Sequence, residues 1–257
     1  MIDQPAIFIT GAASGIGRAV AARFATRDWV LGLADRDAEA LEAVYDRLPT
    51  EDAHPHPLDV QDAESVRSAL QQFGAVTDGR LDVLVNSAGV MTVGRFADTD
   101  LGAHKQHLSV NLWGVMTVAH AAFPLLKATS GSRMISIASG AGLYGTPELA
   151  SYAASKAGVR SLTQSLNLEW DPHDIHVCDI IPPYVDSPMT QGAPRTKSME
   201  RLGVLLTPDD VADVVDEAVQ TNTVHWPVGK QFSWLYRASE LLPSPLNRLL
   251  MRYVSGF

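Results

Sequence analysis

The sequence predicts an α/β fold built on one doubly wound parallel sheet with helices on both faces. Short apolar runs alternate with helix-like segments through nearly the whole chain, as in repeated strand–helix–strand units. The first apolar run is followed by a glycine-rich turn that opens a helix. The length of 257 residues suits one domain with a buried sheet. No linker or repeat interrupts it, so we expect residues 1–257 to form a single domain.

Composition excludes several classes of protein. Hydrophobic residues make up 46% and charged residues 19%, which is ordinary for a globular protein. The formal net charge of −9 argues against nucleic-acid binding. The one cysteine, Cys178, excludes an internal disulfide. We see no apolar run of the roughly 18 residues that span a bilayer, and the N-terminus lacks the basic region of a signal peptide. We therefore expect a cytoplasmic protein.

The elements follow from the apolar pattern. Strands are predicted at residues 6–10, 29–34, 54–59, 81–85, 133–138, 175–181 and 226–232. Helices are predicted from the glycine turn to about residue 27, at 37–48, from 62 onward, and at 100–127, 148–170 and 207–220. Asn111 stands in the middle of one long helix, where asparagine is a poor helix former, so it predicts a local kink or a polar task. Residues 188–206 read as a substrate loop and 232–257 as an apolar tail.

Several chemistry-bearing residues follow predicted strand ends. They are Gly11, Asp35, Asp59, Asn86, Ser139 and Pro182. In an open parallel sheet, ligands bind at the carboxyl ends of the strands. We therefore expect these residues to line one cleft.

The glycine turn has the spacing Gly11-x-x-x-Gly15-x-Gly17. Between a strand and a helix it presents backbone N–H groups to a phosphate. Asp35, about 20 residues further on, can accept hydrogen bonds from both ribose hydroxyls and repel a 2′-phosphate, which favours NAD. Arg36 beside it could instead accept that phosphate, and Asp35 could simply be a helix cap.

Tyr152 and Lys156 are four residues apart in a predicted helix, so their side chains share a face. The ammonium is expected to lower the pKa of the phenol toward neutrality, where proton transfer is efficient. Ser139, at the end of a strand, offers a hydroxyl for a substrate oxygen. Alone, a Tyr and a Lys at this spacing could merely decorate a helix.

Together these motifs resemble the short-chain dehydrogenase/reductase family over about residues 6–190. Thr10-Gly11-x-x-x-Gly15-x-Gly17 looks like its cofactor loop, and Asn86-Ser-Ala-Gly89 looks like its N-N-A-G segment. Pro182-Pro183 departs from its usual P-G. The resemblance implies a Rossmann-type sheet and a catalytic set of Asn111, Ser139, Tyr152 and Lys156. It implies that the cofactor is held by Gly11, Ser14, Gly15, Ile16, Gly17, Asp35, Arg36, Asp59, Val60, Asn86, Ala88, Gly89, Tyr152, Lys156, Pro182, Val185 and Ser187.

The implied reaction moves a proton and a hydride between a secondary alcohol and a ketone, with NAD(H) favoured and NADP(H) open. Tyr152 would take the proton, Lys156 would hold the ribose, and Asn111 would hold a water as a proton exit. Substrate contacts are expected from Ser139, Leu143, Tyr144, Tyr152 and Met189. The alternatives are an NADPH-dependent carbonyl or 3-ketoacyl reductase and a catalytically idle cofactor sensor. The histidine pairs lack accompanying ligands, so no metal is expected.

The expected partners are a small-molecule substrate and further copies of the chain. The resemblance implies a homodimer or homotetramer built on helices 100–127 and 148–170. The tail, residues 232–257, combines many apolar residues with Arg237, Arg248 and Arg252. It favours packing against a partner subunit or covering an apolar pocket, and hence a fairly hydrophobic substrate. Peripheral contact with a membrane is the less favoured alternative.

Overall fold

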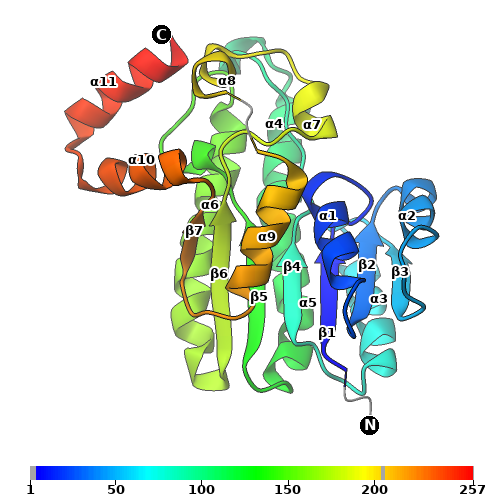
Figure 1. Cartoon of the computed structure of the whole chain (residues 1–257). Helices are drawn as coiled ribbons and strands as arrows, with labels where there is room; N and C mark the ends of the chain where they lie inside the picture. The colour runs from blue at the N-terminus through cyan, green and yellow to red at the C-terminus, as the bar shows by residue number, and fades with distance from the viewer. Residues whose placement is uncertain (1–3, 204–205, 257) are drawn as a thin grey trace.

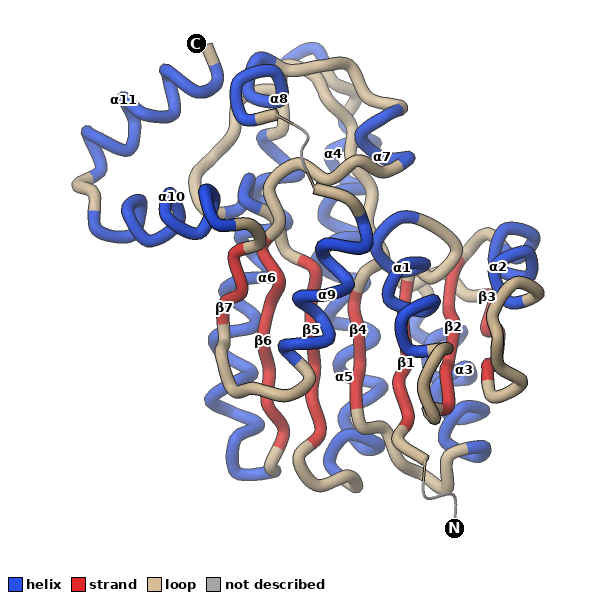
Figure 2. The backbone as a smooth tube through the Cα atoms, viewed as in Figure 1, coloured by secondary structure: helices blue, strands red, loops and turns tan. Residues whose placement is uncertain are grey.

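A computed structural model describes residues 4–203 and 206–256. Their strands form one parallel sheet in the order β3-β2-β1-β4-β5-β6-β7 (Figures 1 and 2). The strands are β1 (Ala6–Thr10), β2 (Val30–Asp35), β3 (Ala53–Pro57), β4 (Val83–Asn86), β5 (Ser132–Ile137), β6 (Ile175–Ile181) and β7 (His225–Pro227). The prediction of a doubly wound, Rossmann-type parallel sheet is confirmed. The order of the strands reverses between β1 and β4, which is where such sheets bind ligands.

Helices cover both faces of the sheet (Figure 1). On one face lie α1 (Gly15–Phe24), α2 (Ala38–Tyr45) and α9 (Pro208–Ala218), whose core contacts include Phe24, Leu41 and Val215. On the other lie α3 (Ala63–Val76), α5 (Gly114–Lys127) and α6 (Ala150–Trp170), whose core contacts include Phe73, Leu126 and Trp170. Each helix buries one apolar stripe against a face of the sheet. The carboxyl ends of the strands are left uncovered by these helices.

The predicted helix 100–127 is interrupted at Asn111. It consists of α4 (Leu101–Leu108), a π-helical turn over Ser109–Trp113, and α5. The π turn widens the helix by one residue and turns Asn111 into the protein, where it is completely buried. Of the local kink or polar task expected for this asparagine, the structure shows an irregular turn of the helix and a hydrogen-bonded side chain.

The segment Leu101–Lys127 is long and apolar enough to cross a membrane, by length and composition only. This segment differs from the expectation that no apolar run is long enough to span a bilayer. Its buried side chains Val118, Ala122 and Leu126 pack into the core beside the sheet. Of the most apolar window of the segment, 44% is buried within the protein.

The C-terminal part differs from the prediction. The strand expected at 226–232 is wrong beyond its start, because β7 ends at Pro227 and α10 (Lys230–Leu241) begins three residues later. Gly229, at a φ of +89°, makes the turn between them. The tail is then completed by α11 (Ser244–Ser255), and Phe257 lies outside the described residues.

The predicted substrate loop, residues 188–206, contains two short helices. They are α7 (Pro188–Gln191) and α8 (Lys197–Leu202). Residues 204–205 of this predicted loop lie outside the described ones. Single 3-10 turns occur at Phe96–Asp98, Gly140–Gly142 and Asp171–His173. The loop and the tail together stand above the carboxyl edge of the sheet (Figure 2).

Candidate active site

A cleft of about 660 Å³ opens at the carboxyl ends of the strands. A volume of this size accommodates a small-molecule ligand. Most of the residues predicted for the site line it: Gly11, Ser14, Gly15, Ile16, Asp35, Arg36, Asp59, Val60, Ala88, Gly89, Ser139, Leu143, Tyr144, Tyr152, Lys156, Pro182, Val185, Ser187 and Met189. Five of the six strand-end residues expected to share one cleft line it, namely Gly11, Asp35, Asp59, Ser139 and Pro182, and for Asn86 the expectation is wrong.

Three predicted site residues do not line the cleft. Gly17 lies beneath the glycine turn. Asn86 is buried at the end of β4, where its amide nitrogen is 3.5 Å from Ser136 Oγ and its carboxamide oxygen has no hydrogen-bond partner among the described residues. Asn111 is buried behind the cleft wall. These residues shape the site from behind its surface.

The glycine turn is shaped by close backbone approach. A Cβ on Gly11 would lie 2.8 Å from the backbone of Ala88, and Gly11 has a φ of +71°. A Cβ on Gly17 would lie 2.1 Å from the Gly11 carbonyl oxygen. Only glycine fits at either place, so the turn can bring backbone N–H groups and the start of α1 to the floor of the cleft. This cradle fits the pyrophosphate of a dinucleotide.

Asp35 closes the opposite end of this cradle. Its carboxylate accepts hydrogen bonds from the backbone N–H of Ala13 and of Asp37, each at 3.1 Å. These bonds fix the carboxylate between the glycine turn and α2, with its remaining lone pairs available in the cleft. Asp37, and not Asp35, is the N-cap of α2, because it accepts from the Ala40 N–H. Arg36 lines the same cleft.

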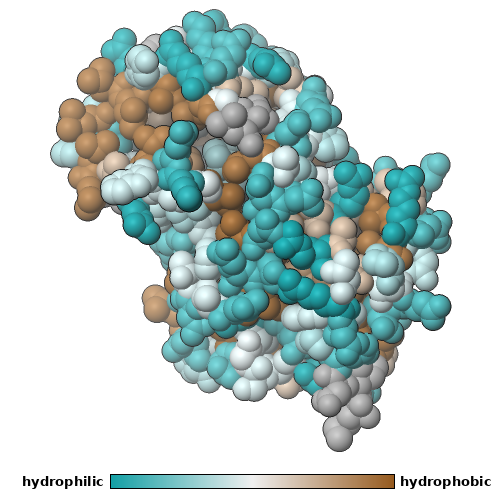
Figure 3. Space-filling view, in the orientation of Figure 1, coloured by the Kyte–Doolittle hydropathy of each residue, from teal (hydrophilic) through white to brown (hydrophobic). Residues whose placement is uncertain are grey.

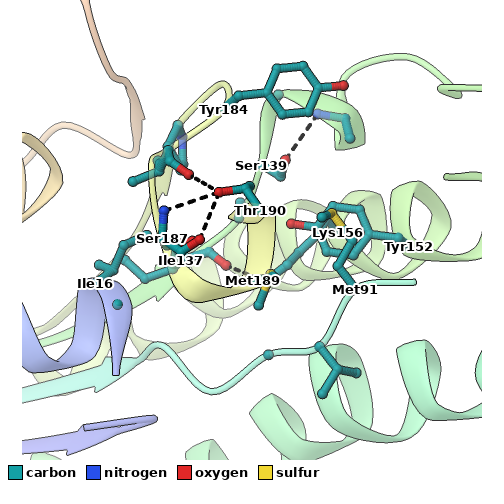
Figure 4. Close-up of a pocket in the computed structure, with 18 of the residues that line it drawn as sticks. Ile16, Met91, Ile137, Ser139, Tyr152, Lys156, Tyr184, Ser187, Met189 and Thr190 are labelled. Carbon is teal, nitrogen blue, oxygen red and sulfur yellow. Dashed lines mark hydrogen bonds between the residues drawn. The ribbon is translucent and has the colours of Figure 1, made fainter. Parts of the chain in front are cut away.

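Tyr152 and Lys156 project together from α6 (Figure 4). The Lys156 Nζ lies 6.0 Å from the centre of the Tyr152 ring and donates to the Ile137 carbonyl at 2.7 Å. Burial lowers the pKa of Lys156 to about 8. Burial also raises the pKa of Tyr152, against an interaction with the Ser139 side chain that lowers it. The expected lowering by Lys156 is therefore not found in the protein alone, because desolvation of the phenolate dominates.

Ser139 stands where β5 ends, facing the same part of the cleft (Figure 4). Its Oγ accepts from the Ala141 N–H at 3.2 Å, which fixes the side chain at the start of a 3-10 turn. The Gly140 N–H donates to the Pro182 carbonyl. The Pro182-Pro183 pair, which departs from the family's usual P-G, therefore still provides a backbone hydrogen-bond acceptor at this place. The site thus combines a phenol, an ammonium and a hydroxyl within one partly enclosed space.

Ser187 is held by a residue that the sequence analysis missed. Thr190 Oγ1 accepts from the Ser187 N–H at 3.1 Å and lies 2.6 Å from the Val185 carbonyl, to which it donates (Figure 4). This pairing starts α7 and turns Met189 toward the cleft. A Ser followed three residues later by Thr is a weak form of the capping pattern, which was the available signal.

Asn111 positions neighbouring segments. Its side chain accepts from the Val90 N–H at 2.8 Å and donates to the Val90 carbonyl and to Ser155 Oγ. Ser155 in turn donates to the Tyr152 carbonyl. The amide is thus committed to protein groups, and it ties the segment after β4 to α6. Its placement supports a positioning role, and the predicted place in a proton exit stays a prediction.

The histidines His104 and His107 form a hydrogen-bond network beside the site. The Nδ1 atoms of both rings lie within hydrogen-bond distance of Ser151 Oγ, at 2.6 and 2.8 Å. His107 Nε2 accepts from the Thr92 N–H. The network anchors the segment after β4 beside Tyr152, whose ring meets His107 edge-on. Spacing in the sequence gave no signal for it.

The outer half of the cleft is apolar and was only partly predicted. Beyond Leu143, Tyr144 and Met189, its lining includes Leu149, Leu202, Phe232, Leu235, Tyr236, Leu250, Met251 and Val254. Phe232 packs so close to Gly140 that a Cβ there would lie 2.6 Å from its ring. The expectation that the tail covers an apolar pocket agrees with this placement. Nothing in the sequence pairs these late residues with the catalytic strand ends.

Known proteins resemble this chain over most of its length. The sequence profile of the family described as short chain dehydrogenase matches residues 5–198. The meso-2,3-butanediol dehydrogenase of Serratia marcescens is 33% identical over 236 residues, which cover 88% of this chain and 93% of that one. The 11-beta-hydroxysteroid dehydrogenase A of Sesamum indicum is 34% identical over 190 residues, 72% of this chain and 54% of that one.

A solved structure agrees with these relatives. The 3-ketoacyl-(acyl-carrier-protein) reductase of Brucella melitensis, complexed with NADH, has a TM-score of 0.79 and 25% identity, with 89% of this chain and 98% of that chain covered. The fold, the order of the motifs and the cleft therefore indicate the same family as the sequence comparisons. The chain belongs to the short-chain dehydrogenase/reductase family and is an oxidoreductase of that family.

Proposed function

We propose that the protein is an NAD(H)-dependent oxidoreductase that interconverts a secondary alcohol and a ketone on a fairly hydrophobic substrate. The observation that carries the proposal is the meeting of Tyr152, Lys156 and Ser139 at the inner end of a cleft whose outer half is apolar. A substrate oxygen bound among these polar groups would leave the rest of the molecule among the side chains of the tail.

The residues of the cleft fit a dinucleotide. The glycine turn would hold its pyrophosphate, Asp35 its adenosine ribose, and Ser187 the carboxamide of its nicotinamide. When bound, the nicotinamide supplies the hydride acceptor for oxidation or the donor for reduction. Asp35 supports NAD over NADP because its fixed carboxylate would repel a 2′-phosphate, and the Brucella melitensis reductase was solved with NADH.

The side chains of the inner cleft have different roles in the proposed proton transfer. In oxidation the Tyr152 phenolate takes the hydroxyl proton of the substrate, and in reduction the phenol returns a proton to the ketone oxygen. Ser139 positions and polarises that oxygen. Lys156 would hold the ribose hydroxyls of a bound nucleotide and would supply a positive charge near the phenolate. Since burial raises the pKa of Tyr152, oxidation is expected to speed up, and reduction to slow down, as the pH rises.

The first test compares NADH with NADPH binding by calorimetry, for the wild type and for Asp35→Ser. We expect the wild type to prefer NADH and the variant to lose that preference. Preference of the wild type for NADPH would overturn the cofactor assignment and favour a carbonyl or 3-ketoacyl reductase. Binding of neither nucleotide would favour the idle cofactor-sensing alternative.

The second test measures kcat/KM over a series of secondary alcohols that differ only in apolar size. The apolar outer cleft predicts that kcat/KM rises with each added apolar group until the cleft is filled. Turnover of small polar alcohols with none of larger apolar ones would contradict the substrate class and leave the reaction type standing.

A further inference from the structure

The two C-terminal helices carry exposed apolar side chains that take no part in the cleft. Trp234 and Leu241 of α10 are 76% and 86% exposed. Leu246, Leu249 and Tyr253 of α11 are 50%, 63% and 73% exposed. We call these five residues the tail surface. Figure 3 shows hydrophobic side chains gathered over this part of the molecule.

Helix α11 has two apolar faces with different surroundings. One face lines the cleft with Leu250, Met251 and Val254. The other presents Leu246, Leu249 and Tyr253, which follow the spacing i, i+3 and i+7 of a single helix face. A helix that only covers a pocket needs one apolar face. The second face therefore calls for a partner outside the described chain.

The charge around this surface is opposite to that of the whole chain. The chain has a formal net charge of −9. Over residues 230–256 the sequence instead has four basic residues and one acid: Lys230, Arg237, Arg248, Arg252 and Glu240. Helix α8, which packs on α11, adds exposed Lys197 and Arg201 against Glu200. The tail surface is thus apolar with a basic border, and its partner should be apolar with an anionic border.

A second copy of this chain fits that requirement poorly. In a two-fold dimer through the tail surface, the same patch would face itself, and Arg237 and Arg248 would approach their own counterparts. A bilayer with anionic headgroups fits better. Its acyl boundary accepts Trp, Leu and Tyr side chains, while arginine stems lie along the apolar surface and carry their charges to the phosphates.

We propose that the tail surface binds peripherally to anionic lipid bilayers, with α10 and α11 lying in the interface. The mouth of the cleft would then be near the acyl boundary, because Tyr144, Leu202 and Leu235 are both exposed and part of the cleft lining. The proposal goes beyond the proposed function and holds whichever substrate and nucleotide the cleft takes.

The test is flotation of the purified full chain with vesicles of pure phosphatidylcholine or of phosphatidylcholine and phosphatidylglycerol in equal parts. We expect the protein to float with the anionic vesicles only. Leu249→Glu should abolish flotation. The matched control is Leu168→Glu, which adds the same charge at a leucine of α6 that is 76% exposed, and it should float like the wild type. Nucleotide binding and the melting temperature check that both variants are folded.

The basic border is tested separately. The double variant Arg237→Gln/Arg248→Gln should bind the anionic vesicles roughly fivefold more weakly per arginine removed. Added salt should weaken the binding of the wild type more than that of this variant.

Three outcomes would overturn the proposal. They are no flotation of the wild type, equal flotation with neutral vesicles, and full flotation of Leu249→Glu. If the wild type does not float and Leu249→Glu instead lowers the molecular mass in sedimentation velocity, the tail surface is a contact between subunits. Because flotation needs neither nucleotide nor substrate, its failure is distinct from failure of the proposed oxidoreductase reaction.

Discussion

The two walls of the cleft are built by different means. The cofactor wall consists of backbone brought close to backbone, as at Gly11, where a Cβ would lie 2.8 Å from Ala88. The substrate wall consists of side chains such as Phe232, Leu250 and Met251. The family match, residues 5–198, covers the first wall and ends before the helices of the second. Backbone geometry constrains the amino acid at each position far more strongly than an apolar lining does, so the second wall is free to vary with the substrate.

The largest effect is expected where the two walls meet, at Tyr152. Tyr152→Phe removes the proton donor and acceptor without changing the shape of the wall. We expect kcat to fall by roughly 10²- to 10⁴-fold, the usual contribution of general acid–base catalysis. The nucleotide dissociation constant should stay near that of the wild type. Steady-state kinetics and calorimetry on the same preparation measure both, and a variant that retained most of its kcat would remove Tyr152 from its proposed role.

Gly17→Ala tests whether the cofactor wall depends on backbone contact. The added Cβ would lie 2.1 Å from the Gly11 carbonyl oxygen and 3.2 Å from the Ala12 Cα, and this backbone cannot move aside cheaply. Overpacking of this kind costs about 1–3 kcal/mol of unfolding free energy. We expect denaturant unfolding to show that loss and nucleotide binding to weaken. Gly145→Ala is the control, since a Cβ there meets no atom of the described residues within 4 Å.

Lys156 is expected to lower the free energy of unfolding, although the proposed reaction requires it. Its pKa is about 8 in the folded protein against the ordinary 10.5. Between these values the unfolded chain binds the extra proton, so stability rises with pH across this window, by at most about 3 kcal/mol. Below pH 8 the folded protein carries the full cost of the buried charge. Lys156→Met should therefore be inactive and more stable at pH 7.

The measurement is the unfolding free energy of wild type and Lys156→Met from pH 7 to pH 10. The advantage of the variant should shrink as the pH rises above 8. An advantage that stays constant with pH would mean that burial of the ammonium is not its cause. Part of any gain is offset because the Ile137 carbonyl loses its hydrogen-bond donor.

The smallest effect is expected on the substrate wall. Leu250→Ala removes apolar area from the outer cleft and leaves the polar inner end intact. We expect kcat/KM for an apolar alcohol to fall by roughly 10-fold, with little change for a small one. Nucleotide affinity should not change. If both alcohols were affected equally, Leu250 would support the fold of α11 and not the substrate.

The same contrast explains what the sequence could predict. Gly11, Asp35, Ser139 and Tyr152 follow strand ends or share a helix face, so local patterns were enough to bring them together. The helices α10 and α11 reach the cleft only through the turn at Gly229, and no local pattern pairs Phe232 with Gly140. The segment from Trp226 to Phe232 predicts a strand because its apolar residues show no helical periodicity. This prediction includes Pro227 and Gly229 in the strand, although both residue types commonly mark turns.

Local sequence patterns also could not predict the pKa of Tyr152 or the hydrogen-bond partners of Asn111. The positive charge of Lys156, four residues from Tyr152, predicts a lowered pKa of the Tyr152 phenol. Burial of Tyr152 instead raises that pKa. Burial depends on the sheet, the tail and the loop together, and no spacing of two residues contains it. For the same reason Asn111 could be identified as unusual in its helix, while its bonds to Val90 and Ser155 could not.

The order of the strands also sets an order of assembly during synthesis. Strand β1 is made before β2 and β4 but lies between them, so the glycine turn meets Ala88 only after β4 has left the ribosome. Lys156 follows with α6, and α10 and α11 emerge after it. A nascent chain thus completes its nucleotide cradle before its substrate pocket. A nucleotide bound at that stage would stabilise the folded sheet by mass action.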